Sequence, residues 1–302
     1  MRSCGNANRL RRIAAADRRV RRDAAEFGDT QQAARGRPGS YGDLLYVSGG
    51  PSNKVYVFTF PAGQLVQTLS GLDYPTSECS DAAGNVWIGD NTGLFEYAHG
   101  GTSPISNLHG AVGGGCAVDP TTGNLAATNQ DSVLVWAPGN SNPATYKYPG
   151  ARLEYCGYDN AGNLFIDLHD DSSALLELPY GSGALQAIIL SKRVAQPGQV
   201  QWDGSSMTVQ DESKPFAIYR FQATGSSANI VGSTKLKGIT KHAALSWITD
   251  NSVVVPFGNR RGGAKMIGFW DYPSGGKPTQ VLDSFGFSRS FQAATVSVAA
   301  RR

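Results

Sequence analysis

The sequence predicts an all-β fold, a six-bladed β-propeller of four-stranded blades. A first observation is the phrase Asp-x-x-Gly-Asn followed by an apolar run, which occurs at Asp81–Asn85, at Asp159–Asn163 and, with one extra residue, at Asp119–Asn124. A second is the period of the phrase, about forty residues, which is typical of repeat architectures. A third is the content of each period, several short apolar runs separated by Gly, Pro, Asn and Asp. Strand-sized runs with turn residues between them favour a propeller over a helical solenoid.

The repeated phrase predicts the turn between the first two strands of a blade. Gly-Asn populates positive φ at little cost, so Asp81–Asn85 should be a hairpin turn. The apolar triplets that follow the turns, or occupy the same place in the period, are the expected second strands: 45–47, 86–88, 125–127, 164–166, 207–209 and 253–255.

Third and fourth strands follow in each period. The expected third strands are 55–58, 94–97, 133–136, 175–178, 217–221 and 266–270. The expected fourth strands have the weakest pattern and lie at 65–69, 105–108, 146–148, 188–190, 231–236 and 279–282.

The number of second strands predicts six blades, and the end of the chain predicts how the ring closes. Successive second strands are separated by 41, 39, 39, 43 and 45 residues. No first strand precedes Leu44, whereas Phe291–Val298 is an apolar run with no blade after it. We therefore expect this run to supply the inner strand of blade one, which would cover an otherwise open sheet edge.

The repeats resemble those of NHL-type six-bladed propellers and, more loosely, lactonase-like (SMP-30) and YncE-like bacterial propellers. The turns Tyr97–Gly101 and Tyr272–Gly276 are similar to those of uncharacterised secreted bacterial propellers. The resemblance covers about residues 41 to 298 and implies the fold. It implies no catalytic residue, and functions differ widely among propellers.

Composition and charge predict one propeller domain at 41–300 and a separate tail at 1–40. The tail contains ten arginines and four acidic residues, whereas 41–300 is mildly acidic, so the net charge of +3 gives no reason to expect a nucleic-acid partner. The tail lacks a strand pattern and is expected to be disordered or marginally helical.

The compartment is not fixed by the sequence. The resembling propellers look secreted or periplasmic, but residues 1–40 contain no apolar core of the kind found in secretory signals. No segment has the length and hydrophobicity of a transmembrane helix.

Three cysteines precede the repeated aspartates on expected inner strands. Cys116 and Cys156 share one offset and should not meet, whereas Cys79 has the opposite parity and could face Cys116. The favoured interpretation is three small buried residues between blades. The spacing of the cysteines and histidines gives no zinc pattern.

Propeller ligands commonly bind the face formed by the loops that enter each first strand and those that join second to third strands. On this sequence that face is rich in carboxylates and carboxamides. The candidate binding residues are Glu78, Asp90, Asn129, Glu154, His169, Asp211, His242 and Arg289. His169 also begins the densest polar cluster, His169–Asp171, where a general base would be possible, although turn preference alone explains Asp and Asn in such loops.

Two functions remain open at this point. The favoured one is a monomeric propeller that binds an unknown small molecule, glycan or protein without catalysis and without a cofactor. The alternative is a calcium-dependent, lactonase-like hydrolase, in which Glu78, Glu154, Asn129 and Asp211 would hold an axial metal. The two differ in whether these side chains converge on one point or bond to nearby loop amides.

Overall fold

The computed structural model describes residues 41–110, 113–169, 173–259, 263–283 and 290–300. The predicted tail at 1–40 lies outside the described residues, and so does the candidate binding residue Arg289. Among the described residues, the regular secondary structure consists of β-strands and one short 3-10 helix, η1 (Gly50–Ser52). Within the sheets, most neighbouring strands are consecutive in the chain and pair antiparallel.

The first sheet joins the two ends of the described chain. Its order is β25 (Ala293–Ser297), β1 (Leu44–Gly49), β2 (Lys54–Thr59) and β3 (Leu65–Ser70). Leu44 is opposite Ser297 and Ser48 is opposite Ala293 in the antiparallel register. The C-terminal run therefore lies beside β1, the position that the sequence predicted for it.

The next two sheets have four strands each. One has the order β4 (Ser77–Ser80), β5 (Val86–Asp90), β6 (Gly93–Tyr97), β7 (Pro104–His109). The other has the order β8 (Cys116–Val118), β9 (Leu125–Asn129), β10 (Ser132–Trp136), β11 (Ala144–Lys147).

The fourth sheet has eight strands. Four come from 156–190: β12 (Cys156–Tyr158), β13 (Leu164–Asp167), β14 (Ala174–Leu178) and β15 (Gln186–Leu190). Four come from 197–235: β16 (Pro197–Trp202), β17 (Met207–Asp211), β18 (Ala217–Thr224) and β19 (Ser227–Lys235). The two groups meet where Ile189 and Leu190 pair in parallel with Ser227 and Ala228. The sequence analysis did not predict this junction.

The fifth sheet has an interrupted inner edge. Its members are β20 (His242–Ala243), β21 (Trp247–Ile248), β22 (Ser252–Gly258), β23 (Met266–Asp271) and β24 (Gln280–Leu282). Both β20 and β21 pair with β22. Between them, the side chain of Gln210 bonds to Ala244 O and Ser246 N, each at 3.0 Å, so these backbone groups are satisfied by a neighbouring sheet instead of β22.

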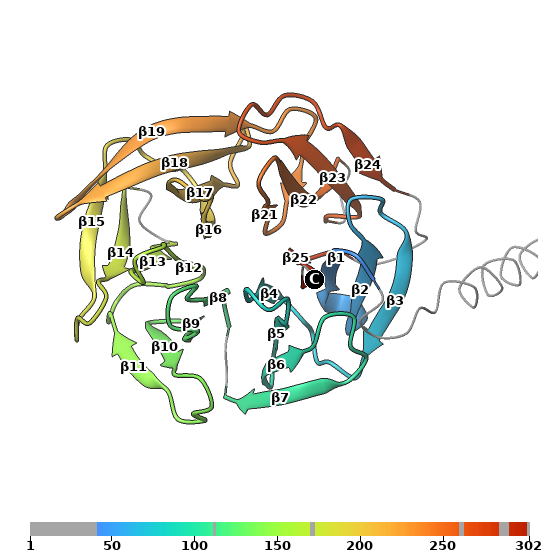
Figure 1. Ribbon diagram of the computed structural model, residues 1–302. Helices are drawn as coiled ribbons and strands as arrows, with labels where there is room; N and C mark the ends of the chain where they lie inside the picture. The colour runs from blue at the N-terminus through green and yellow to red at the C-terminus, as the bar shows by residue number, and fades with distance from the viewer. Residues whose placement is uncertain (1–40, 111–112, 170–172, 260–262, 284–289, 301–302) are drawn as a thin grey trace, which may run out of the picture. The chain divides into compact units, whose positions relative to one another are not determined.

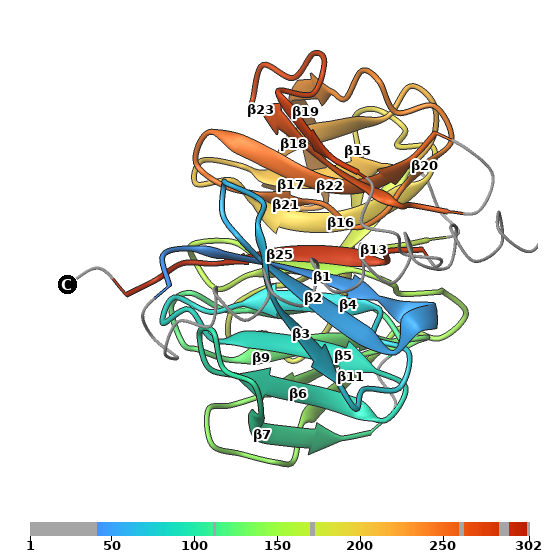
Figure 2. The same cartoon turned by 90° about the vertical axis from the view of Figure 1, so that its right-hand side faces the viewer.

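The sheets of residues 41–300 are arranged around a common centre, with β25, β4 and β8 near the middle and β3, β7 and β11 at the periphery (Figure 1). A view turned by 90° shows β25 and β1 side by side along their length, running between the two faces of the ring (Figure 2). The core lies in the gaps between neighbouring sheets. In one gap, for example, Leu45 and Phe58 of the first sheet pack in one cluster with Phe269 of the fifth.

The expectation that all three cysteines are unpaired packing residues was wrong. Cys79 on β4 and Cys116 on β8 form a disulfide with 5.7 Å between their Cα atoms, so they are not unpaired packing residues. Their opposite offsets in the repeat let the two side chains face each other across neighbouring sheets. Cys156 is a buried free thiol, as expected for it.

Among the described residues, no helix is long and apolar enough to cross a membrane.

Candidate functional site

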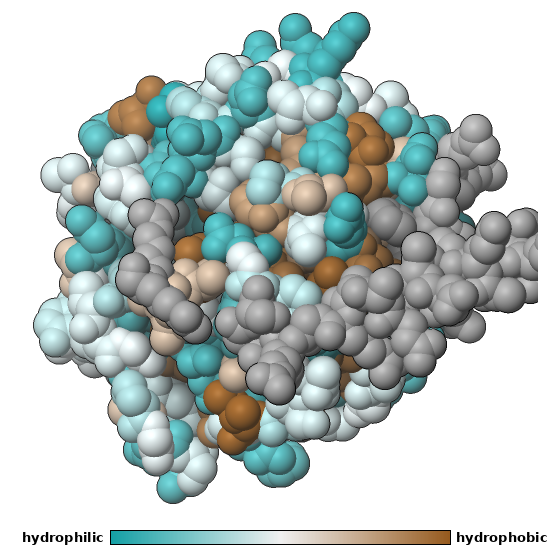
Figure 3. Space-filling model, turned by 45° about the vertical axis from the view of Figure 1, so that its right-hand side comes forward, coloured by the Kyte–Doolittle hydropathy of each residue, from teal (hydrophilic) through white to brown (hydrophobic). Residues whose placement is uncertain are grey.

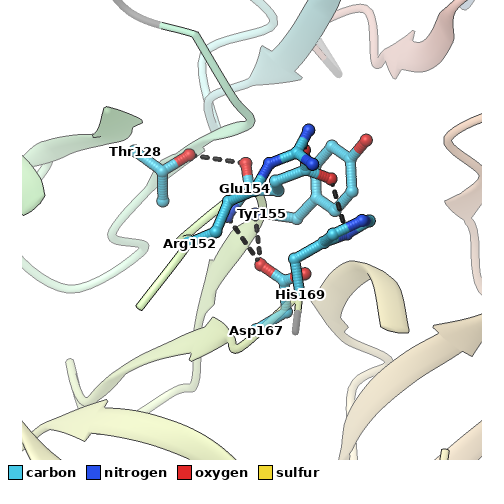
Figure 4. A network of polar contacts seen from close by, with 6 residues as sticks. All are labelled: Thr128, Arg152, Glu154, Tyr155, Asp167 and His169. Atoms are coloured by element: carbon cyan, nitrogen blue, oxygen red, sulfur yellow. Dashed lines mark hydrogen bonds and ion pairs between the residues drawn. The ribbon is translucent and has the colours of Figure 1, made fainter. Parts of the chain in front are cut away.

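A polar cluster forms where the loop 152–155 enters β12. Its members are labelled in Figure 4: Thr128, Arg152, Glu154, Tyr155, Asp167 and His169. The Glu154 carboxylate lies against the Arg152 guanidinium through one oxygen, and its other oxygen is 2.8 Å from His169 Nδ1 (Figure 4). Two predicted candidates, Glu154 and His169, are therefore in contact.

The backbone of this loop is held from both sides. Asp167, at the end of β13, accepts hydrogen bonds from Glu154 N at 2.9 Å and Tyr155 N at 2.6 Å. The Glu154 carbonyl accepts from Thr128 Oγ1 at 2.5 Å. A Cβ on Gly114 would lie 2.1 Å from that same carbonyl oxygen, so glycine is required for the close approach. The side chains of Glu154 and Tyr155 are thus presented from a fixed backbone.

Burial shifts the ionisation of several groups here. Asp167 is fully buried, and its Oδ2 has no hydrogen-bond partner within the described part of the chain. Desolvation raises the pKa of its carboxyl well above the usual range despite the two backbone donors. Desolvation, reinforced by the charges of Glu154 and Asp211, raises the pKa of Glu212 to about 8. The phenol pKa of Tyr155 is also raised, by desolvation and then by the charge of Glu212. Shifted acids in one place are typical of functional sites.

A small pocket lies beside this cluster. It has a volume of about 190 Å³ and is lined by Tyr155 and Glu212 together with His242, Ser290 and Gln292 and nearby backbone. The segment 244–246 that forms part of its lining is the one held by Gln210. His242, a predicted candidate, is exposed at this pocket. We call Arg152, Glu154, Tyr155, Glu212 and His242 the entering-loop site.

The other predicted residues lie elsewhere. Asp90 ends β5 and accepts hydrogen bonds from Asp73 N at 2.8 Å and Thr92 N at 2.7 Å. Asp211 ends β17 and accepts from Ala195 N and Gln196 N, each at 3.2 Å. These two carboxylates fasten an entering loop to a strand end, the same arrangement as at Asp167. Asn129 ends β9 and is half-buried.

Glu78 differs from the expectation of a loop residue. It lies within β4 and is 3% exposed, and neither carboxylate oxygen has a hydrogen-bond partner among the residues that the structure describes. Desolvation raises the pKa of its carboxyl well above the usual range, and the nearby Ser48 backbone offsets only part of this. Burial disfavours the ionised form of this carboxyl, which makes it unsuited to hold a cation.

The donor set proposed for calcium therefore does not fit a single axial site. Asp211 is engaged with loop amides, Glu154 faces Arg152 and His169, and Glu78 is buried in a strand. Within the described ranges, no three His, Cys, Asp or Glu side chains are grouped as metal ligands would be. We derive no chemical step through a metal.

Glu212, Tyr155 and Asp167 were not among the candidate binding residues chosen from the sequence. Glu212 follows Asp211, and consecutive residues at a strand end point in opposite directions. Asp211 turns to the loop amides, whereas Glu212 lines the pocket. The raised pKa of Glu212 has no sequence signal, because it depends on burial and on the nearby Glu154.

No protein-family model matches this sequence, and the search of curated proteins gives no match either. Solved structures are similar to it in fold. One is a protein of unknown function from Bacteroides caccae, with a TM-score of 0.63 and 15% identity over 85% of this chain and 99% of that chain. Another is the Cps50 (Swd1) β-propeller domain of Myceliophteria thermophila, with a TM-score of 0.54 and 10% identity over 76% of this chain and 80% of that one.

A third similar chain belongs to a mitotic checkpoint complex, with a TM-score of 0.54 and 13% identity over 70% of this chain and 67% of that chain. At these identities the likeness concerns the fold alone. The chain has an all-β, propeller-like fold.

Proposed function

We propose that this chain is a monomeric, six-bladed β-propeller that binds a small polar ligand, or a polar loop of a partner, at the entering-loop site without catalysis. The observation that carries the proposal is Glu212, a carboxyl with a pKa of about 8 in the lining of a pocket of about 190 Å³. Near neutral pH such a group both donates and accepts hydrogen bonds. Tyr155, His242 and Ser290 add further polar groups around the same space.

Six blades are the simplest division of the strands. The eight-stranded sheet divides into two groups of four, and the strand pairing between the groups is limited to two residues of β15 and two of β19. The interrupted pair β20 and β21 then counts as one inner strand. The buried hydrophobic residues of the described chain fall into six clusters, which supports the same division. Residues 1–40 are proposed to be a separate tail.

The acidic groups of the cluster beside the pocket favour binding over hydrolysis, because they are already engaged with other protein groups. Glu154 contacts Arg152 and His169, and Asp167 holds two backbone amides. A preformed, polar and narrow site of this kind suits recognition of a small group that both donates and accepts hydrogen bonds.

The test is a thermal-shift screen of polyols, amino compounds and lactones against the full chain. Ligands that bind only the folded state raise Tm. We expect compounds that stabilise the wild type and lose this effect in Glu212→Gln. The control is Glu177→Gln on β14, where Glu177 accepts a hydrogen bond from Gln186 Nε2 at 3.1 Å. Stabilisation that is unchanged in Glu212→Gln would exclude this pocket.

The calcium-dependent lactonase remains the competing function. It predicts a rise of Tm with added Ca²⁺ and hydrolysis of a lactone, both lost in Glu154→Gln. Ca²⁺-dependent lactone hydrolysis by the wild type would overturn the non-catalytic proposal, whereas its absence together with polar ligand binding supports it.

A further inference from the structure

A second and much larger cavity lies on the face where β25 ends. It has a volume of about 1110 Å³ and reaches from the gap between β4–β7 and β8–β11 to Trp247 on β21 and Val298 beyond β25. Its lining includes loops that join first to second and third to fourth strands, such as 81–83 and 137–141. Seen obliquely on this face, hydrophobic side chains gather around the middle of the ring (Figure 3).

Three of the five tryptophans of the chain line this one cavity: Trp87, Trp136 and Trp247. Among the described contacts, none engages the indole N–H of these three, whereas Trp270 Nε1 donates to Lys237 O at 3.1 Å. Aromatic surface is concentrated on the cavity wall, where it is available to a ligand.

The open gap between β4–β7 and β8–β11 is not present at every equivalent position of the repeat. Phe165 on β13 and Phe221 on β18 occupy the repeat positions of Trp87 and Trp136. Their rings meet edge to face, 5.7 Å between centroids, and fill the gap between their strand groups. Within the described contacts, no ring contact joins Trp87 to Trp136, and both line the open cavity instead.

The inner end of the gap is fixed by the disulfide. Cys79 is directly opposite Trp87 in the β4–β5 pairing, and it is bonded to Cys116 on β8. The two strands that bound the gap are therefore joined covalently beside Trp87. This holds the two walls at a set spacing.

The charges of the wall are all of one sign. Its titratable lining residues in the described ranges are five carboxylic acids and no Lys, Arg or His: Asp43, Asp81, Glu96, Asp119 and Asp250. Glu96 pairs across β5–β6 with Trp87, so a carboxylate adjoins an indole ring on the same sheet face. Acids without a basic side chain among the described lining residues give the cavity a negative potential, and the face of an indole ring attracts cations.

We propose that this cavity binds an organic cation with an apolar body, such as a quaternary or tertiary ammonium that carries a ring. The apolar body packs against Trp87, Trp136 and the aliphatic wall formed by Leu125 and Val118, while the cationic nitrogen lies beside Glu96. This site is separate from the entering-loop site, since the two pockets share no lining residue.

The test uses benzyltrimethylammonium as the cationic probe and N-benzylacetamide as an uncharged molecule of similar size. Binding to the full chain is followed by tryptophan fluorescence and by isothermal titration calorimetry. We expect the cation to bind at least about tenfold more tightly than the amide, because it gains both the cation–π attraction and the charge interaction. Equal binding of the two probes would overturn the proposal.

Variants assign the binding to the cavity. Glu96→Gln should weaken the cation by roughly threefold to tenfold, and Trp87→Leu by a similar factor. Glu177→Gln is the matched control, since Glu177 holds the same repeat position as Glu96 and pairs with Phe165 as Glu96 pairs with Trp87. If Trp87→Leu does not fold, Glu96→Gln against Glu177→Gln decides alone.

Two further results would contradict the proposed ligand class. One is that benzyltrimethylammonium shows no binding at a concentration of about 1 mM, because a weaker affinity than this is not expected of a preformed site. The other is tight binding of a neutral oligosaccharide, with cellotetraose as the probe, that is lost in Trp87→Leu and retained in Glu96→Gln. That pattern would assign the tryptophans to sugar stacking.

Discussion

At the scale of single residues, the repeated Asp is a turn-forming side chain. Asp159 Oδ1 accepts from Ala161 N at 2.8 Å and Asn163 N at 2.9 Å, and its Oδ2 accepts from Asn163 Nδ2 at 2.8 Å. Asp81 makes the same three contacts in its own turn. The phrase Asp-x-x-Gly-Asn recurs because each copy needs these acceptors and a glycine at positive φ, 83° at Gly162.

Replacement of this Asp should therefore destabilise the fold without touching either pocket. We expect Asp159→Ala to lower the free energy of unfolding by about 1–3 kcal/mol, since three hydrogen bonds to an ionised group are lost. Urea unfolding measures the change. The neighbouring exposed residue gives the control, Asn160→Ala, which should have almost no effect; equal losses in both variants would contradict the role of the carboxylate.

Glu212 makes a prediction about pH. Its pKa is raised from 4.5 to about 8, chiefly by burial. Between these values the folded chain keeps a proton that the unfolded chain releases, so this group lowers the free energy of unfolding as pH rises from 4.5 to 8. Glu212→Gln removes the effect, and the stability of the variant relative to wild type should increase over this range.

The measurement is urea unfolding of wild type, Glu212→Gln and Glu177→Gln at pH 5, 6, 7 and 8. Only the difference between Glu212→Gln and wild type should depend on pH. A constant difference over the series would mean that Glu212 has an ordinary pKa in the folded chain.

At the scale of strands and turns, the apolar pattern of the sequence predicted the strands whose side chains pack between the sheets. The second and third strands, such as 86–88 and 94–97, were predicted because their side chains fill the gaps between sheets. An inner strand was expected at Cys79, but its start was not located, because Ser77–Ser80 contains one apolar residue, and Glu78 was therefore placed in the entering loop. The parallel contact of β15 with β19 was also missed, because pairing between strand edges depends on three-dimensional position and leaves no local pattern.

The entering-loop site could also be predicted only in part, because side-chain contacts depend on three-dimensional position. Glu154, His169 and His242 follow from the expected loop positions. Which carboxylates bond to backbone and which face a cavity depends on side-chain length and direction. Asp90 and Asp211 are short enough to reach loop amides, whereas Glu212 lines a pocket.

The disulfide between β4 and β8 leads to a prediction about the free energy of unfolding. We expect the double variant Cys79→Ser, Cys116→Ser to lose about 2–4 kcal/mol of unfolding free energy, because the crosslink closes a long loop in the unfolded chain. The two cysteines are 37 residues apart. Binding of benzyltrimethylammonium should weaken as well, since the walls of the larger cavity are no longer tied.

The pairing itself is checked by mass spectrometry of the oxidised, denatured chain after alkylation. Cys79 and Cys116 should remain unlabelled without reductant while Cys156 reacts. The stability control is Cys156→Ala, which leaves the crosslink intact. Alkylation of Cys79 and Cys116 without reductant would contradict the disulfide.

For the ring as a whole, closure depends on the C-terminal strand. β25 pairs with β1 over Leu44–Ser48, Gln292 N donates to Ser48 O at 2.9 Å, and the buried Phe291 lies edge to face with Tyr56, 6.0 Å between centroids. β25 also packs between the first and last sheets, where Val296 and Ala294 belong to the cluster that contains Phe269. Its removal would expose the ladder edge of β1 and the core behind it.

We therefore expect a chain that ends at Ser290 to aggregate, or to unfold at a much lower temperature than the wild type. A chain that ends at Ala300 is the control, because it keeps β25 and the hydrogen bond from Ala299 N to Asp43 Oδ1. Light scattering after size exclusion and thermal unfolding measure the outcome. A synthetic peptide of residues 291–302 should restore part of the lost stability, since the vacated edge of β1 offers the same backbone ladder. A shortened chain that stays monomeric with unchanged Tm would show that the other sheets hold the ring without this strand.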